Sequence, residues 1–248
     1  QSEQPYLYQW GDAAVWAPMQ FLTIGALDNY NYQDHAQYYA LKWLNTVTSN
    51  FVSPQPATHR PFKFGDGTRS PGFLYEKYNE DWIKDLAKII KEQGFDYNAT
   101  VENWKKPSHK WQMNTHIVNI AMMLKSEAVS HEILGEEYAD NAEKLRTILD
   151  KYNGTVFEGF TGDEVLSGLD PTRGTECCAI VEHMYSYEEI FAHTGENKWA
   201  ERLEVLGFNA LPATPSEDMW THQYVQQVNQ IACQKTMIMA PWSTNGPY

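Results

Sequence analysis

The sequence has few cysteines, few basic residues and no long apolar run. Its 3 cysteines cannot form a disulfide framework, and a bridge between the adjacent Cys177 and Cys178 would be strained. No run of about 18 apolar residues occurs, so a membrane-spanning helix is not expected. The 248 residues include 19 basic and 32 acidic ones, for a net charge of −13. Because such a chain repels anionic surfaces, we expect no nucleic acid and no membrane as partner, and a neutral or cationic small molecule as ligand.

Aromatic residues are abundant, with 9 Trp, 15 Tyr and 10 Phe. Their flat faces suit sugars and other flat ligands, although large aromatic side chains also fill ordinary cores. The chain carries two glycosylation sequons, at Asn98 and Asn153. Since such sequons are used in secreted glycoproteins, we expect a secreted, extracellular location.

Apolar spacing predicts a series of helices joined by connections rich in Gly and Pro. The expected helices span residues 13–29, 34–50, 79–94, 115–125, 136–152, 176–194 and 196–210. Asp34 is the expected N-cap of the second helix. The side chains expected to be buried between helices are Trp82, Ile89, Leu145, Leu203 and Leu206. Alternating helices with few strand signals indicate an all-α fold, in a single domain over residues 1–248.

The connections between these helices are long in three places. Residues 51–72 carry four Pro and three Gly, so a lid or a break in the domain is expected there. Residues 95–112 are polar and irregular, and residues 153–175 are rich in Gly and Asp. Beyond Pro212 the pattern does not decide the conformation, which could be a strand, an extended segment or a short helix.

Two acidic motifs in the second half of the chain could carry chemistry. In Glu176-Cys177-Cys178 a carboxylate and a thiolate two residues apart can reach one metal ion; the alternative is a pair of small buried side chains beside a capping glutamate. Glu164 lies on the preceding loop, where it is a candidate general acid if burial raises its pKa. A solvated turn is the alternative for that loop.

The segment 218–230 combines amides, an imidazole and aromatic rings. His222, Gln223 and Tyr224 are candidates for binding sugar hydroxyls, which need paired donors and acceptors beside a stacking face. A polar connection between helices would have the same composition. His116 and Glu76 are the remaining candidates, although a lone histidine on a helix is more often structural.

Three motifs follow one another here: E-x-C within GTECCAIVEH, then FNALP, then HQYVQQVNQ. With LYEKYNEDWIKDLAKIIKEQGFDY and THIVNIAMMLK upstream of them, they make residues 73–248 resemble glycoside hydrolase family 127, the β-L-arabinofuranosidase-like proteins. This resemblance implies an (α/α)6 toroid and a retaining glycosidase whose nucleophile is a zinc-bound cysteine. Carried over to matching positions, Glu176 and Cys178 are zinc ligands, Glu164 is the general acid/base and His116 lines the sugar site.

The resemblance also implies two ligands that this sequence does not supply. In the family an adjacent cysteine pair, which includes the nucleophile, lies downstream of the NQI segment, whereas this sequence ends at Tyr248. Cys177 occupies a position that is often Leu in the family, and Cys233 stands alone. Two of the four expected zinc ligands are therefore not present in this chain.

The N-terminal region carries a second resemblance. The stretches QWGDAAVWAPMQFLTIGALDNY and ALKWLNTVTSNF are similar to the toroid of trehalase and glucosidase families 37 and 63. Those families imply an inverting hydrolase, with Glu76 of the E-K-Y element as its catalytic base. Both resemblances imply a toroid of about twelve helices, more than this length supplies, so a partial or composite toroid is expected.

Three functions remain open from the sequence. The first is a retaining, zinc–cysteine glycosidase acting on L-arabinofuranosides or related glycans. The second is an inverting α-glucosidase or trehalase-like hydrolase, and the third is a non-catalytic, sugar-binding toroid. A carbohydrate is the expected partner in each case, and a homodimer is the candidate assembly.

Overall fold

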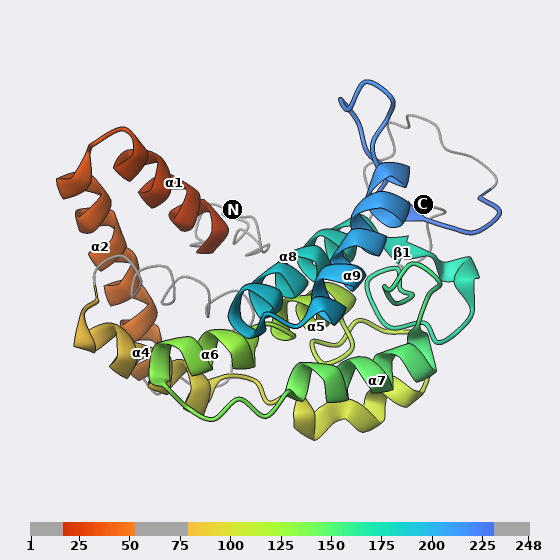
Figure 1. The fold of residues 1–248 in the computed structure, drawn as a ribbon, viewed down its shortest axis with the longest axis horizontal. Coiled ribbons are helices and arrows are strands. Elements are labelled where there is room, and N and C mark those ends of the chain that lie inside the picture. The colour runs from red at the N-terminus through yellow and green to blue at the C-terminus, as the bar shows by residue number, and fades with distance from the viewer. Residues whose placement is uncertain (1–16, 53–78, 231–248) are drawn as a thin grey trace, which may run out of the picture. The chain divides into compact units, whose positions relative to one another are not determined.

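The structure is a computed structural model that describes residues 17–52 and 79–230. It divides into two compact units, residues 1–95 and 96–248, which are described separately below (Figure 1). Helices dominate the described part of both units, and the strands found there are two residues long. The all-α class predicted from the sequence is therefore confirmed. None of the described helices is long and apolar enough to cross a membrane.

The first unit is built from α1 (Ala17–Asn29), α2 (Gln33–Val52) and α4 (Asp81–Gln93). Asn31 adopts a left-handed conformation, with φ 63°, in the short turn that reverses the chain between α1 and α2. The helices pack around one apolar cluster, formed by Ile24, Ala36, Ala40, Trp43, Leu44, Ile83, Leu86 and Ile90. Asp34 lies in the first turn of α2 and is not its N-cap as predicted, because the helix begins one residue earlier.

The prediction that Trp82 is buried is wrong. Ile83, Leu86 and Ile90 form the buried stripe of α4 at the i, i+3, i+7 spacing of a helix face. Trp82 precedes this stripe by one residue, so it projects from the flank of α4 and is 38% exposed. Ile89 and Leu203 are half-buried, whereas Leu145 and Leu206 are buried as expected.

The second unit contains most of the helices. They are η1 (Asn98–Lys105), α5 (Ile117–Met123), α6 (Ser126–Leu134), α7 (Asn141–Asn153), η2 (Pro171–Arg173), α8 (Cys177–Thr194), α9 (Asn197–Val205), the π-helical turn η3 (Leu206–Ala210) and η4 (Leu211–Ala213). Helix α8 packs against α5, α6 and α9 (Figure 1). The two strands, β1 (Thr175–Glu176) and β2 (Val225–Gln226), pair antiparallel.

Several boundaries in this unit differ from the predictions. Helix α6 was not expected, and η1 occupies part of a segment expected to be irregular. The helix predicted over 136–152 begins at Asn141, because Asp140 adopts a left-handed conformation with φ 53°. The helix predicted over 196–210 changes from α to π geometry at Leu206.

The core of the second unit encloses polar side chains as well as rings. His183 lies between Phe160 and Tyr187, with ring centroids 4.1 Å and 5.5 Å away. The sequon residue Asn153 is fully buried, where its amide donates to the Trp104 carbonyl at 2.8 Å and accepts from the Gly168 N–H at 3.0 Å. Its amide nitrogen is thus committed inside the folded unit, while the other sequon residue, Asn98, is exposed.

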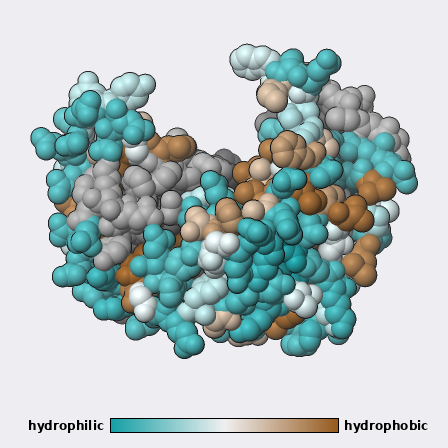
Figure 2. All heavy atoms as spheres, viewed as in Figure 1, coloured by the Kyte–Doolittle hydropathy of each residue, from teal (hydrophilic) through white to brown (hydrophobic). Residues whose placement is uncertain are grey.

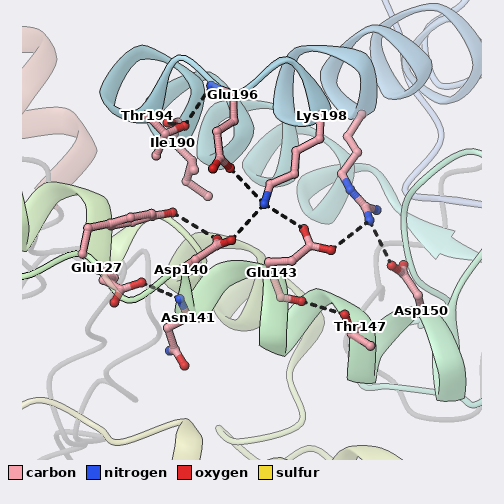
Figure 3. Close-up of polar contacts among 12 residues, drawn as sticks. Glu127, Asp140, Asn141, Glu143, Thr147, Asp150, Ile190, Thr194, Glu196 and Lys198 are labelled. Carbon is pink, nitrogen blue, oxygen red and sulfur yellow. Dashed lines mark hydrogen bonds and ion pairs between the residues drawn. The ribbon is translucent and has the colours of Figure 1, made fainter.

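Ion pairs join α7 to α9 on the surface of the second unit (Figure 3). The Lys198 ammonium lies 2.9 Å from Asp140, 2.9 Å from Glu196 and 3.6 Å from Glu143. On the next turn of α9, Arg202 reaches Asp150 at 3.3 Å and Glu158 at 2.5 Å. The same area forms a continuous hydrophilic region in Figure 2.

We expect Lys198→Met to lower the free energy of unfolding by about 1 kcal/mol. The substitution keeps the length of the side chain but leaves three carboxylates without their shared cation, and solvent screening keeps the effect small because the lysine is about a third exposed. Urea denaturation measures the change. Lys88→Met, which removes the exposed i, i+3 pair with Asp85, is the control and should change stability by less. Equal losses in the two variants would contradict a cooperative network.

Some predictions fall outside the described residues. They are Glu76 as an alternative catalytic base, Cys233, and most of the lid or break expected at 51–72. The single-domain prediction remains a prediction.

Candidate functional site

Four chain segments of the second unit meet at one place and are joined by backbone hydrogen bonds. The Ile117 N–H donates to the Glu164 carbonyl at 3.0 Å, and the Leu166 N–H donates to the Thr115 carbonyl at 2.9 Å. The Glu176 N–H donates to the Gly162 carbonyl at 3.1 Å. The start of α5, the loop around residue 164 and the start of α8 are therefore fixed together.

The fourth segment is added by the pairing of β1 with β2. Glu176 is paired with Val225, and the Cys177 N–H donates to the Tyr224 carbonyl at 2.8 Å. Gly174, just before β1, has φ 71° and lies against Val225 and the Gln226 carbonyl. This close approach places Tyr224 beside Glu176 although the whole of α8 and α9 separates them in sequence.

Acidic, imidazole and phenolic groups converge where these segments meet. His116 Nε2 lies 3.3 Å from Glu164 Oε2. The Tyr224 hydroxyl lies 2.8 Å from Glu176 Oε1 and also hydrogen-bonds Glu164 Oε1, so one phenol bridges two carboxyl groups. One ligand atom from each of His116, Glu164 and Glu176 lies within 4.8 Å of the others.

The donor set at this site fits a metal ion. Glu176 is 2% exposed, yet its Oε2 has no hydrogen-bond partner, and the buried His116 Nδ1 has none either. Buried polar atoms without partners are costly, which is why such atoms often face a ligand. Cys178 lies two residues after Glu176, in the first turn of α8, but it is exposed and its sulfur is not among the ligand atoms that lie within 4.8 Å of one another. The imidazole and the two carboxyl groups of the cluster are groups that Zn²⁺ binds in proteins.

Backbone strain occurs at the site. Glu164 has φ 105°, a value that side-chain-bearing residues rarely adopt. The loop is fixed in this conformation from both sides: the Glu164 carbonyl accepts from Ile117, and the preceding Asp163 carboxylate accepts from the Arg173 guanidinium, with Nε at 3.0 Å. The strain aims the Glu164 side chain at Tyr224 and His116.

Burial and the clustering of acids shift the ionisation of the site. Burial raises the pKa of Glu176 to about 7, and the negative charge of Glu164 acts in the same direction. Cys178 is exposed as a residue, but partial burial of its thiol, with Glu176 beside it, raises the pKa of that thiol to about 12. Burial and the two carboxylates also raise the pKa of Tyr224 well above its ordinary value. The metal-free site therefore binds protons more readily than free side chains do.

We expect the metal-free protein to lose stability as pH rises through about 7. The Glu176 carboxyl has an ordinary pKa of 4.5 and a folded-state pKa of about 7. Because the folded state binds its proton more tightly, this stabilisation is complete below about pH 4.5 and is lost as pH rises through the folded pKa. Urea midpoints between pH 5 and pH 8, measured with a chelator present, test this. Glu176→Gln, which has no titrating proton, should flatten the profile; an unchanged profile in that variant would contradict the assignment.

The structure brings together four of the site residues predicted from the sequence: His116, Glu164, Glu176 and Tyr224. Cys178 is near Glu176 in sequence but is exposed and is not part of this cluster. The structure does not bring His222 and Gln223 to the cluster. His222 is exposed, with Nδ1 3.3 Å from the Gln223 carbonyl, and the Gln223 amide donates to the Ala213 carbonyl at 2.6 Å.

Sequence reasoning did not single out Trp111, which lies next to the site. Its ring centroid is 5.6 Å from that of His116, and the side chain is 45% exposed. The available signal was a single tryptophan in the polar stretch 105–116.

Comparison with known proteins supports the two resemblances inferred from the motifs. A family model described as Trehalase matches residues 2–60. Among solved structures, a glycoside hydrolase family 127 beta-arabinofuranosidase is similar, with a TM-score of 0.53 and 18% identity. The similarity covers 79% of this chain and 32% of that one, so this chain spans about a third of its length. No curated protein matches. At this identity the likeness concerns the fold, and it confirms the predicted toroid-type, all-α class.

Proposed function

We propose that the chain is part of a glycoside hydrolase. The observation that carries the proposal is the hydrogen-bonded cluster of Glu164, Glu176, Tyr224 and His116. Paired carboxyl groups are the usual catalytic groups of glycosidases, in which one of them gives a proton to the leaving oxygen. An exposed tryptophan ring beside the cluster supplies a face on which a sugar can stack.

The finer proposal is a retaining enzyme of the zinc–cysteine type that acts on L-arabinofuranosides or related glycans. It is supported by the E-x-C motif and by the fold likeness to a beta-arabinofuranosidase. Glu176 and Cys178 would hold the zinc. When bound, zinc stabilises a thiolate nucleophile at neutral pH.

The residues of this chain would handle the proton. Glu164 would give its proton to the leaving oxygen while the nucleophile, which the resemblance places downstream of Tyr248, bonds to the anomeric carbon. Glu164 would then take a proton from the water that displaces this nucleophile, as a retaining mechanism requires. Tyr224 holds the Glu164 carboxyl in place through its hydroxyl, and His116 contacts the other oxygen of the same carboxyl.

The test combines metal analysis with turnover of an aryl L-arabinofuranoside by the full-length protein, in which the cysteine pair that the resemblance places downstream of Tyr248 would complete the zinc site. We expect one zinc per chain and a first product of retained anomeric configuration, observed by NMR. Cys178→Ser should lose both zinc and turnover, whereas Cys177→Ser, which changes the neighbouring thiol, should keep them. Absence of zinc together with unchanged turnover in Cys178→Ser would contradict the zinc–cysteine proposal. Binding of the glycoside without turnover would favour a sugar-binding protein.

A second candidate is an inverting, trehalase-like hydrolase, favoured by the family match over residues 2–60. In that case Glu76 would be the base. The same NMR experiment separates the two candidates, because an inverting enzyme releases the opposite anomer. Loss of turnover in Glu76→Gln, with zinc content unaffected, would support this second candidate.

A further inference from the structure

A group of basic residues lies on the loop that leads to the candidate site. The sequence from residue 105 to residue 116 is KKPSHKWQMNTH and has no acidic residue, in a chain whose net charge is −13. Lys106, His109 and Lys110 are exposed and make no ion pair within the part of the chain that the structure describes; we call these three residues the basic strip. Lys105 is excluded because it pairs with Glu102.

The strip is held next to the site. Lys110 directly precedes Trp111, so their Cα atoms are about 3.8 Å apart, and the Trp111 ring is 5.6 Å from the His116 ring. The site's negative charges, in contrast, are grouped at Glu164 and Glu176. A ligand that extends from His116 over Trp111 and along the preceding residues would therefore leave the acidic groups and approach the basic strip.

The loop that carries the strip is ordered by contacts to the site itself. The Ser108 N–H donates to the Leu166 carbonyl at 2.7 Å, and the Ser108 carbonyl accepts from the Arg173 guanidinium. Arg173 also binds Asp163, the residue before Glu164. At the other end of the loop, the Trp104 indole donates to the Asn114 carbonyl at 2.8 Å. The position of the strip is thus coupled to that of Glu164.

We propose that the basic strip binds an anionic group on the glycan, one sugar away from the ring that enters the site. This inference rests on the proposed function, since it takes the sugar at His116 and Trp111 as the one acted upon. The substrate is then an acidic glycan that carries a uronic-acid carboxylate or a sulfate ester, with a neutral sugar in the catalytic position. The proposed acidic glycan departs from the neutral or cationic ligand that was expected from the net charge of the chain alone.

A nucleic acid fits the strip less well. Polyanion binding gains affinity from many phosphate contacts made together, whereas this strip offers two lysines and one histidine. The remainder of the chain is acidic and would repel a long phosphate backbone.

The test measures binding by calorimetry, so that it does not depend on turnover. Three oligosaccharides of equal length, each with the same neutral terminal sugar, are compared with the full chain at low salt: the second sugar carries a uronic-acid carboxylate in one, a sulfate ester in another and no charge in the third. We expect the acidic oligosaccharides to bind about fivefold to tenfold more tightly than the neutral one, and 0.3 M salt to remove most of this difference. The ratio between the first two identifies carboxylate or sulfate as the preferred group.

Matched variants locate the effect. Lys106→Gln/Lys110→Gln should remove the preference for acidic glycans while leaving neutral binding unchanged. The double variant Lys88→Gln/Lys144→Gln, which removes the same charge from exposed lysines elsewhere, should keep the preference for acidic glycans. Trp111→Ala should weaken the binding of acidic and neutral glycans alike, and Trp111→Phe should restore the binding of both.

Three outcomes would overturn the inference: equal affinity for acidic and neutral glycans, equal losses in the two lysine pairs, or equally tight binding of a single-stranded oligonucleotide of the same charge. Strip-dependent binding without any hydrolysis would leave this inference standing and contradict only the proposed catalytic function.

Discussion

Replacing Glu164 by glutamine should lower kcat for glycoside hydrolysis by about 10²- to 10⁴-fold, with a smaller change in KM. The amide keeps the shape and the contact to Tyr224 but cannot give a proton to the leaving oxygen. The effect should be smallest for substrates with an acidic leaving group, because their departure needs little protonation. Steady-state kinetics with two aryl glycosides of different leaving-group pKa measures both effects.

The control for this experiment is Glu201→Gln, which removes an exposed carboxylate from α9 and should leave kcat unchanged. Glu164→Gly separates function from stability. It removes the general acid, but glycine accepts φ 105° without strain, so the free energy of unfolding should rise by about 1 kcal/mol. A Glu164→Gln variant with wild-type kcat on both substrates would contradict the role of Glu164.

Gly174→Ala should lower the free energy of unfolding by an amount on the order of 3–5 kcal/mol and should also disrupt the site. Gly174 has φ 71° and ψ −160°, a combination that essentially only glycine adopts. An added Cβ would collide with the Gln226 carbonyl oxygen and a Val225 methyl group. Since backbone cannot rotate away as a flexible side chain does, β2 would have to separate from β1.

Gly195→Ala is the control for that experiment. Gly195 caps the C-terminus of α8 with φ 68°, and no atom lies within 4 Å of the position its Cβ would take. Gly195→Ala should therefore lower the free energy of unfolding by only about 1 kcal/mol, because it carries the conformational penalty alone. Urea denaturation followed by tryptophan fluorescence measures both variants. Equal losses would mean that close approach to β2 contributes nothing at Gly174.

Helices with a clear apolar stripe could be predicted from the sequence, and α8 was predicted to within one residue at its start. The errors arose where tertiary contacts decide the conformation. Trp82 fits a helical repeat by its spacing, yet Ile83, Leu86 and Ile90 fill the buried face of α4. No pattern of apolar residues predicts the change to π geometry at Leu206.

The candidate site was predictable in parts. Glu164 and Glu176 could be proposed from their motifs, because acidic side chains on a Gly-marked loop and beside cysteines are unusual enough to stand out. His116 was one of the candidates named from the residues, and its role at the sugar site was assigned only through a family resemblance. That Tyr224 joins them, while its neighbours His222 and Gln223 do not, depends on the β1–β2 pairing, which links segments distant in sequence. Trp111 also joins the site through a tertiary contact, because the loop that carries it folds back onto His116.

The short pairing of β1 with β2 sets how the site opens in the native state. Its two residue pairs close a long loop that contains α8 and α9. Closing a long loop costs conformational entropy, and only a few hydrogen bonds offset that cost here. The segment after η4 can therefore detach as a local unfolding unit while the helices stay folded. The amide proton of Cys177, which is bonded to the Tyr224 carbonyl, should consequently exchange with solvent much faster than amides in the middle of α8. Each opening would separate Tyr224 from both carboxyl groups, so hydrogen exchange at Cys177 would measure the fraction of time for which the cluster is intact.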